Sequence, residues 1–66
     1  MLARITINPY VCNGRPVICG TRITVQTILK FLAAGDSIED IIEEYPSLTR
    51  EDAQACIAFA AQLIGN

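Results

Sequence analysis

The chain has 66 residues, of which 52% are hydrophobic, and its formal net charge is −2. This length accommodates one small domain, and no apolar stretch reaches the roughly 18 residues that a membrane span requires. The sequence contains no histidine, which excludes serine–histidine and cysteine–histidine catalysis, so we expect a binding protein and not an enzyme.

The N-terminal part of the chain predicts short strands and turns. Residues 4–7 alternate polar and apolar side chains and are rich in β-branched residues, which favours a strand. Asn13-Gly14 is a strong turn signal because both residues tolerate positive φ. Residues 16–18 then favour a short edge strand, since Pro16 cannot donate a ladder hydrogen bond.

The first two of three predicted helices carry clear start and stop signals. Thr24 is the expected N-cap of the first helix, and Gly35 is its expected C′ residue. Ser37 and Asp40 resemble a capping box at the start of the second helix. Pro46 ends that helix. Both helices repeat apolar residues at i, i+3, i+4 and i+7, which predicts one buried face on each.

The third predicted helix is capped by Thr49, runs to about Ile64 and is apolar on nearly every side. Such a helix is normally covered on more than one side. Since only two other helices are available, we expect a second chain to cover it, most simply in a homodimer. Whether the N-terminal strands or this helix form the interface stays open. The candidate residues for a dimer or partner interface are Ile5, Ile7, Ile57, Phe59 and Leu63.

Charge is divided unevenly along the chain. Residues 1–30 carry four basic side chains and no acidic one, whereas residues 31–66 carry seven acidic side chains and one arginine. This asymmetry predicts two faces with different partners. The candidate DNA-binding residues are Arg15, Arg22, Lys30, Arg50 and Gln54. The alternative is that Arg15 and Arg22 pair with acidic residues such as Glu43 or Glu44.

The three cysteines, Cys12, Cys19 and Cys56, predict neither a metal site nor a disulfide framework. Their number is odd, no two of them form a C-x-x-C pair, and no signal-peptide pattern precedes them. We therefore expect small, reduced side chains in a cytoplasmic protein without metal or cofactor.

The motif Gly-Arg-Pro-Val-Ile-x-Gly-Thr-Arg-Ile of residues 14–23, with flanking residues over nearly the whole chain, resembles domain-of-unknown-function family 433. The resemblance implies a VapB-type antitoxin with a homeodomain-like helix-turn-helix, encoded beside a PIN-like nuclease toxin. The expected fold is mostly α: one domain over residues 1–66, with a strand-and-turn arm (1–23) and a three-helix core (24–66).

The leading functional hypothesis is an antitoxin of a type II toxin–antitoxin system. Its acidic second half would occupy the substrate groove of a PIN-like nuclease, and a dimer would present its basic residues to operator DNA. Two alternatives stay open: a stand-alone helix-turn-helix regulator that binds DNA, and a structural oligomerisation module.

Overall fold

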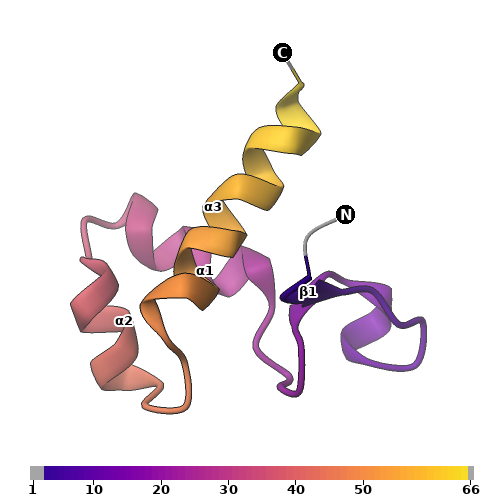
Figure 1. The fold of residues 1–66 in the computed structure, drawn as a ribbon, viewed down its shortest axis with the longest axis horizontal. Coiled ribbons are helices and arrows are strands. Elements are labelled where there is room, and N and C mark those ends of the chain that lie inside the picture. The colour runs from indigo at the N-terminus through magenta and orange to yellow at the C-terminus, as the bar shows by residue number, and fades with distance from the viewer. Residues whose placement is uncertain (1–2, 66) are drawn as a thin grey trace.

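The computed structural model describes residues 3–65 and shows three helices preceded by a small antiparallel sheet (Figure 1). This confirms the mostly α fold with two short strands and a three-helix, helix-turn-helix core. Met1, Leu2 and Asn66, which the predicted boundaries include, lie outside the described residues. The elements are β1 (Ile5–Thr6), the one-turn 3-10 helix η1 (Cys12–Gly14), β2 (Val17–Ile18), α1 (Val25–Ala33), α2 (Ile38–Glu44) and α3 (Arg50–Ile64).

The two strands are shorter than predicted, with two residues each. Ile5 pairs with Ile18 and Thr6 with Val17, and an isolated bridge joins Val17 to Thr24 at the start of α1. This bridge fixes the hairpin against the helical core, so the arm and the core form one packed unit.

The turn at the end of the hairpin is left-handed over three consecutive residues. Cys12, Asn13 and Gly14 have φ of 50°, 58° and 77°. Asparagine and glycine tolerate this region, whereas Cys12 adopts it at a conformational cost. The predicted turn at Asn13-Gly14 is thus confirmed, and it begins one residue earlier than the sequence signal.

The helix starts follow the predicted capping residues. The side chain of Thr24 accepts a hydrogen bond from the Thr27 amide at the first turn of α1. Complete capping boxes begin α2, with Ser37 and Asp40, and α3, with Thr49 and Asp52. Each box satisfies backbone amides that a helix start otherwise leaves unpaired.

The core lies where the hairpin and all three helices meet. Its most completely buried side chains are Val17, Ile18, Ile28, Ile41 and Cys56. Ile5 is also part of this core and is only 6% exposed. Because β1 packs against α3 of the same chain, Ile5 has no side-chain surface left for a partner, which corrects its predicted interface role.

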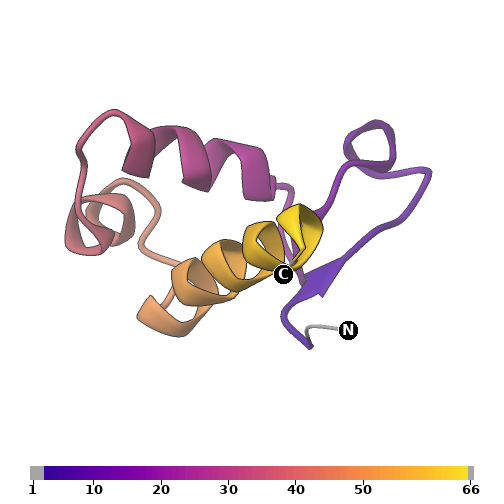
Figure 2. The same cartoon turned by 90° about the horizontal axis from the view of Figure 1, so that it is seen from above.

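The C-terminal half of α3 extends away from the rest of the molecule in Figure 1, and Figure 2 looks down onto this end of the helix. Within residues 3–65 no helix combines the length and the hydrophobicity needed to span a bilayer.

Candidate binding surfaces

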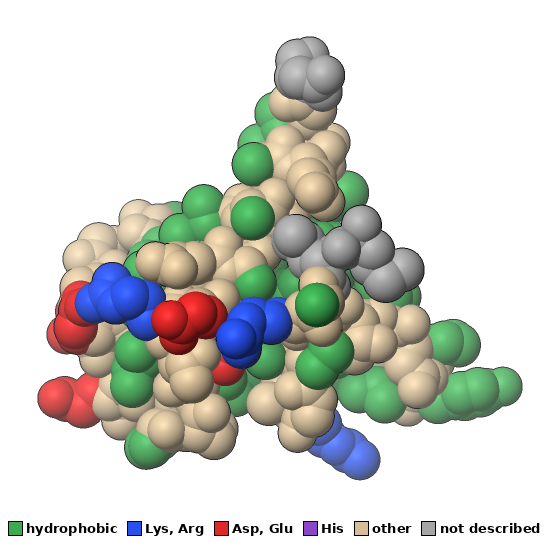
Figure 3. Space-filling model, in the orientation of Figure 1, with side chains coloured by type: hydrophobic (Ala, Val, Ile, Leu, Met, Phe, Trp, Pro, Cys, Tyr) green, Lys and Arg blue, Asp and Glu red, His purple; other side chains and the backbone are tan. Residues whose placement is uncertain are grey.

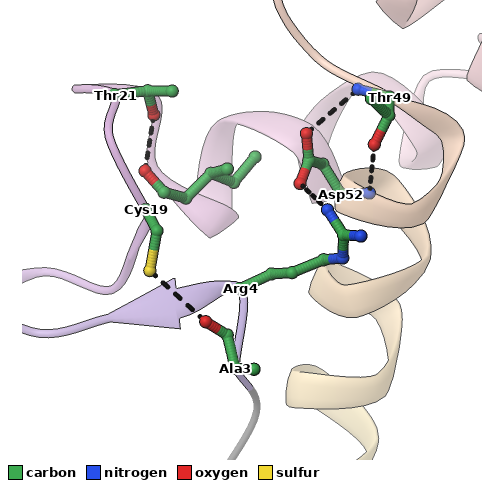
Figure 4. A network of polar contacts seen from close by, with 7 residues as sticks. Ala3, Arg4, Cys19, Thr21, Thr49 and Asp52 are labelled. Carbon is green, nitrogen blue, oxygen red and sulfur yellow. Dashed lines mark hydrogen bonds and ion pairs between the residues drawn. The ribbon is translucent and has the colours of Figure 1, made fainter.

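A polar network joins the N-terminal arm to the first turn of α3 (Figure 4). Arg4 Nη1 lies 3.0 Å from Asp52 Oδ1, and the other carboxylate oxygen of Asp52 accepts the Thr49 amide at 3.0 Å. Burial acts to raise the pKa of Asp52, but the hydrogen bonds from Thr49 and Arg4, with the charge of Arg4, bring it below the ordinary value of 3.8. Arg4 and Asp52 therefore link the N-terminal arm to the start of α3.

In a helix-turn-helix, the N-terminal residues of the third helix are expected to contact DNA bases. In this structure, most side chains at the start of α3 contact other residues of the same chain. Arg50 forms an ion pair with Glu39 of α2. Gln54 is exposed, but so is Glu51 on the same turn, and a carboxylate there repels phosphate. Ala55 is half-buried against the core. Of the two candidate DNA-binding residues on α3, only Gln54 is both exposed and uninvolved in an ion pair within residues 3–65.

The basic residues of the arm and of α1 are more accessible. Arg15, Arg22 and Lys30 are exposed, and none of them forms an ion pair with another described residue. Cys12 links the backbones of the two arginines, because its Sγ donates to the Arg22 carbonyl at 3.4 Å and its own carbonyl accepts the Arg15 amide at 3.1 Å. The predicted pairing of these arginines with Glu43 or Glu44 does not occur within residues 3–65.

The solvent face of α2 is strongly acidic, and acidic side chains are visible on the α2 side of the molecule in Figure 3. All four carboxylates of this helix are exposed. Glu39 pairs with Arg50, and Asp40 closes the capping box, where the Ser37 amide lowers its pKa below the ordinary 3.8. Glu43 and Glu44 form no ion pair with a described residue, so both carboxylates are exposed to solvent without a neutralising charge.

Exposed apolar side chains, here together called the α3 patch, lie on the extended half of α3. It consists of Ile57, Leu63 and Ile64, which are 44%, 73% and 86% exposed, together with the half-buried Phe59. A groove of about 300 Å³ runs between the start of α1 and this half of α3. Leu29, Phe59 and Leu63 line it, with Arg15 at its rim.

The three cysteines occupy different environments. Cys56 is fully buried in the core, and this burial, with the nearby charge of Asp52, raises the pKa of its thiol to about 11. The Sγ atoms of Cys12 and Cys19 donate to backbone carbonyls. Residues 3–65 contain no cluster of three or more cysteine, aspartate or glutamate side chains with metal-binding geometry.

The fold therefore defines a small helix-turn-helix domain with a β-hairpin at its N-terminus. More particularly, the chain belongs to the family described as "Protein of unknown function (DUF433)", whose pattern matches residues 5–60. The family resemblance read from residues 14–23 is thus confirmed.

Two relatives illustrate the family. An uncharacterized protein of Sinorhizobium fredii, y4eO, is 36% identical over 56 residues, which are 85% of this chain and 25% of that protein. The crystal structure of a DUF433 member from Anabaena variabilis superposes with a TM-score of 0.85 at 36% identity, over 89% of this chain and 58% of the other. The chain thus spans about a quarter of the first relative and somewhat more than half of the second.

Proposed function

We propose that this domain is an antitoxin-like binding protein whose acidic α2 face neutralises a PIN-like nuclease. The observation that carries the proposal is the exposure of all four carboxylates of α2, a seven-residue helix without a basic residue. The kind of partner follows from the family resemblance, and the acidic face supplies the chemistry that would recognise a basic, nucleic-acid-binding groove.

The arrangement of these carboxylates suits such a groove. Glu39 and Glu43 are four residues apart on the helix, as are Asp40 and Glu44, so the acidic side chains form two rows along one surface. Charge complementarity of this kind accelerates association and selects against acidic partners. Because the carboxylates are already exposed, binding requires no rearrangement of α2.

Co-expression with a PIN-like nuclease from the adjacent gene, the partner that the family resemblance implies, tests the proposal. We expect one complex on gel filtration and inhibition of RNA cleavage by the purified nuclease. Glu43→Lys should weaken the complex and restore cleavage, whereas Glu51→Lys, an identical change of charge at an exposed site on α3, should have a smaller effect. Absence of a complex, or equal weakening by both variants, would overturn the role of α2.

A second candidate function is binding of operator DNA by Arg15, Arg22 and Lys30. It is favoured by the exposure of these side chains and by the contacts of Cys12 with the backbones of both arginines. Titration of the gene's own promoter fragment at several salt concentrations should give a linear log–log dependence of affinity on salt. Arg22→Ala should reduce the slope by about one and Arg50→Ala, whose arginine is already paired with Glu39, by less. No binding, or binding independent of salt, would exclude this function.

A further inference from the structure

We infer that the α3 patch and the adjoining groove bind a second copy of this chain in a two-fold symmetric dimer. The starting observation is the exposure of three large aliphatic side chains on one helix end, Ile57, Leu63 and Ile64. Leu63 also lines a groove that contains further apolar surface. Exposed apolar side chains gathered in this way on a small domain mark an interaction site.

The α3 patch and the groove adjoin on one surface, which favours a second copy as the occupant. Leu63 and Phe59 belong to the α3 patch and also line the groove. A two-fold axis beside this helix can therefore place the end of each α3 against the groove of the other copy, so that both are covered at once. An interface formed by the same surface on both partners is the usual arrangement in homodimers.

The distribution of charge supports the same occupant. The chain has a net charge of −2, so two copies repel each other wherever their acidic residues meet. Residues 53–65 contain no charged side chain, and every acidic residue lies between residues 36 and 52. The second half of α3 is thus a surface on which two acidic chains can meet without placing like charges in contact.

The N-terminal strands are a poorer interface. Ile5 is buried within its own chain, and each strand has only two residues, so the free edge of β1 offers few backbone groups for pairing. Ile7 is 60% exposed, but it does not line the groove beside α3. The structure therefore favours α3 between the two interfaces that the sequence left open.

Dimer formation has a consequence for the basic surface. Arg15 stands at the rim of the groove, so each copy contributes an arginine beside the interface. The dimer does not rest on the proposed function, because nuclease binding through α2 uses a different surface.

Analytical ultracentrifugation of the full chain over a range of concentrations, with circular dichroism to verify folding, tests the dimer. We expect the wild type to dimerise in the micromolar range and Leu63→Glu to raise the dissociation constant by roughly 100-fold or more, because each dimer then carries two charges in an apolar interface. Leu63 lies near the exposed end of α3, so this variant should retain the wild-type helical spectrum.

Two control variants separate loss of the α3 patch from the effect of an added negative charge elsewhere. Gln62→Glu introduces the same charge at the neighbouring residue, and Ile7→Glu introduces it beside the N-terminal strands. We expect both dissociation constants to stay near that of the wild type. A monomeric wild type, a dimer that survives Leu63→Glu, or equal disruption by Gln62→Glu or Ile7→Glu would overturn the inference.

Discussion

Replacement of Asp52 by alanine tests whether one carboxylate fastens the N-terminal arm to the helical core. Asp52 is 8% exposed and closes the capping box of α3 while it pairs with Arg4, 48 residues away in sequence. Loss of the hydrogen bond that its carboxylate accepts from the Thr49 amide costs about 1 kcal/mol. The ion pair adds about 0.5–1 kcal/mol, since half of the Arg4 side chain is exposed to water that screens its charge. We therefore expect Asp52→Ala to lower the free energy of unfolding by roughly 2 kcal/mol.

Urea unfolding followed by circular dichroism at constant protein concentration measures this loss. With a slope of about 1 kcal/mol per molar urea for a domain of this size, the midpoint should fall by roughly 2 M. Asp52→Asn, which keeps an acceptor for the Thr49 amide, should lose about half as much, and Arg4→Ala no more than about 1 kcal/mol. A midpoint within about 0.5 M of the wild type for Asp52→Ala would refute the fastening role.

The free energy of unfolding, measured as a function of pH below neutrality, provides an independent test of the same carboxylate. The pKa of Asp52 in the folded protein lies below its ordinary value of 3.8. The contribution of Asp52 to the free energy of unfolding is therefore complete above pH 3.8. It is lost as the pH falls through the lower pKa that Asp52 has in the folded protein. Asp52→Asn should remove this part of the pH dependence.

Three further perturbations address the core and one helix end. Because the pKa of Cys56 is raised from 9.0 to about 11, its contribution to stability is complete below pH 9 and should decrease by roughly 2–3 kcal/mol as the pH rises to 11. Gly35→Ala should cost about 1 kcal/mol in thermal unfolding, because Gly35 ends α1 with φ of 100°. Ile41→Ala should cost about 2–5 kcal/mol in urea unfolding, because the side chain is fully buried between the helices.

Each of these perturbations has its own control. Cys56→Ala should abolish the alkaline decrease that belongs to the thiol, and an unchanged decrease would assign it to other groups. Gly65→Ala also replaces a glycine of positive φ, but at the end of the described chain, so it should cost less than Gly35→Ala. Ile7→Ala removes an exposed isoleucine and should change stability by less than about 0.5 kcal/mol, and an equal loss at Ile7 and Ile41 would contradict the described core.

The sequence predicted the features that depend on neighbouring residues. Helix starts at Thr24, Ser37 and Thr49, and the helix end at Gly35, were predicted because a cap needs only residues within one turn. The left-handed turn was predicted from Asn13 and Gly14 for the same reason. No local signal indicated the positive φ of Cys12, which the closure of the hairpin imposes.

The features missed by the sequence depend on contacts between distant segments. The ion pair between Arg4 and Asp52 was not predicted, because nothing local in the sequence shows that the arm packs on α3. Ile5 was placed at an interface, since alternation along a strand shows that one face is buried but not which element covers it. Arg50 was considered available for DNA because its pairing with Glu39 depends on how α2 and α3 pack.

The division of α3 into two halves separates the requirements of folding from those of recognition. Its first half contributes Ala53 and Cys56 to the core, whereas residues 61–65 are all exposed. In the dimer inferred above, substitutions in these last residues would alter which chain is recognised at little cost to folding. Duplicated copies of such a gene could therefore acquire separate pairing preferences through a few changes in the final turns of one helix, while the rest of the domain stayed the same.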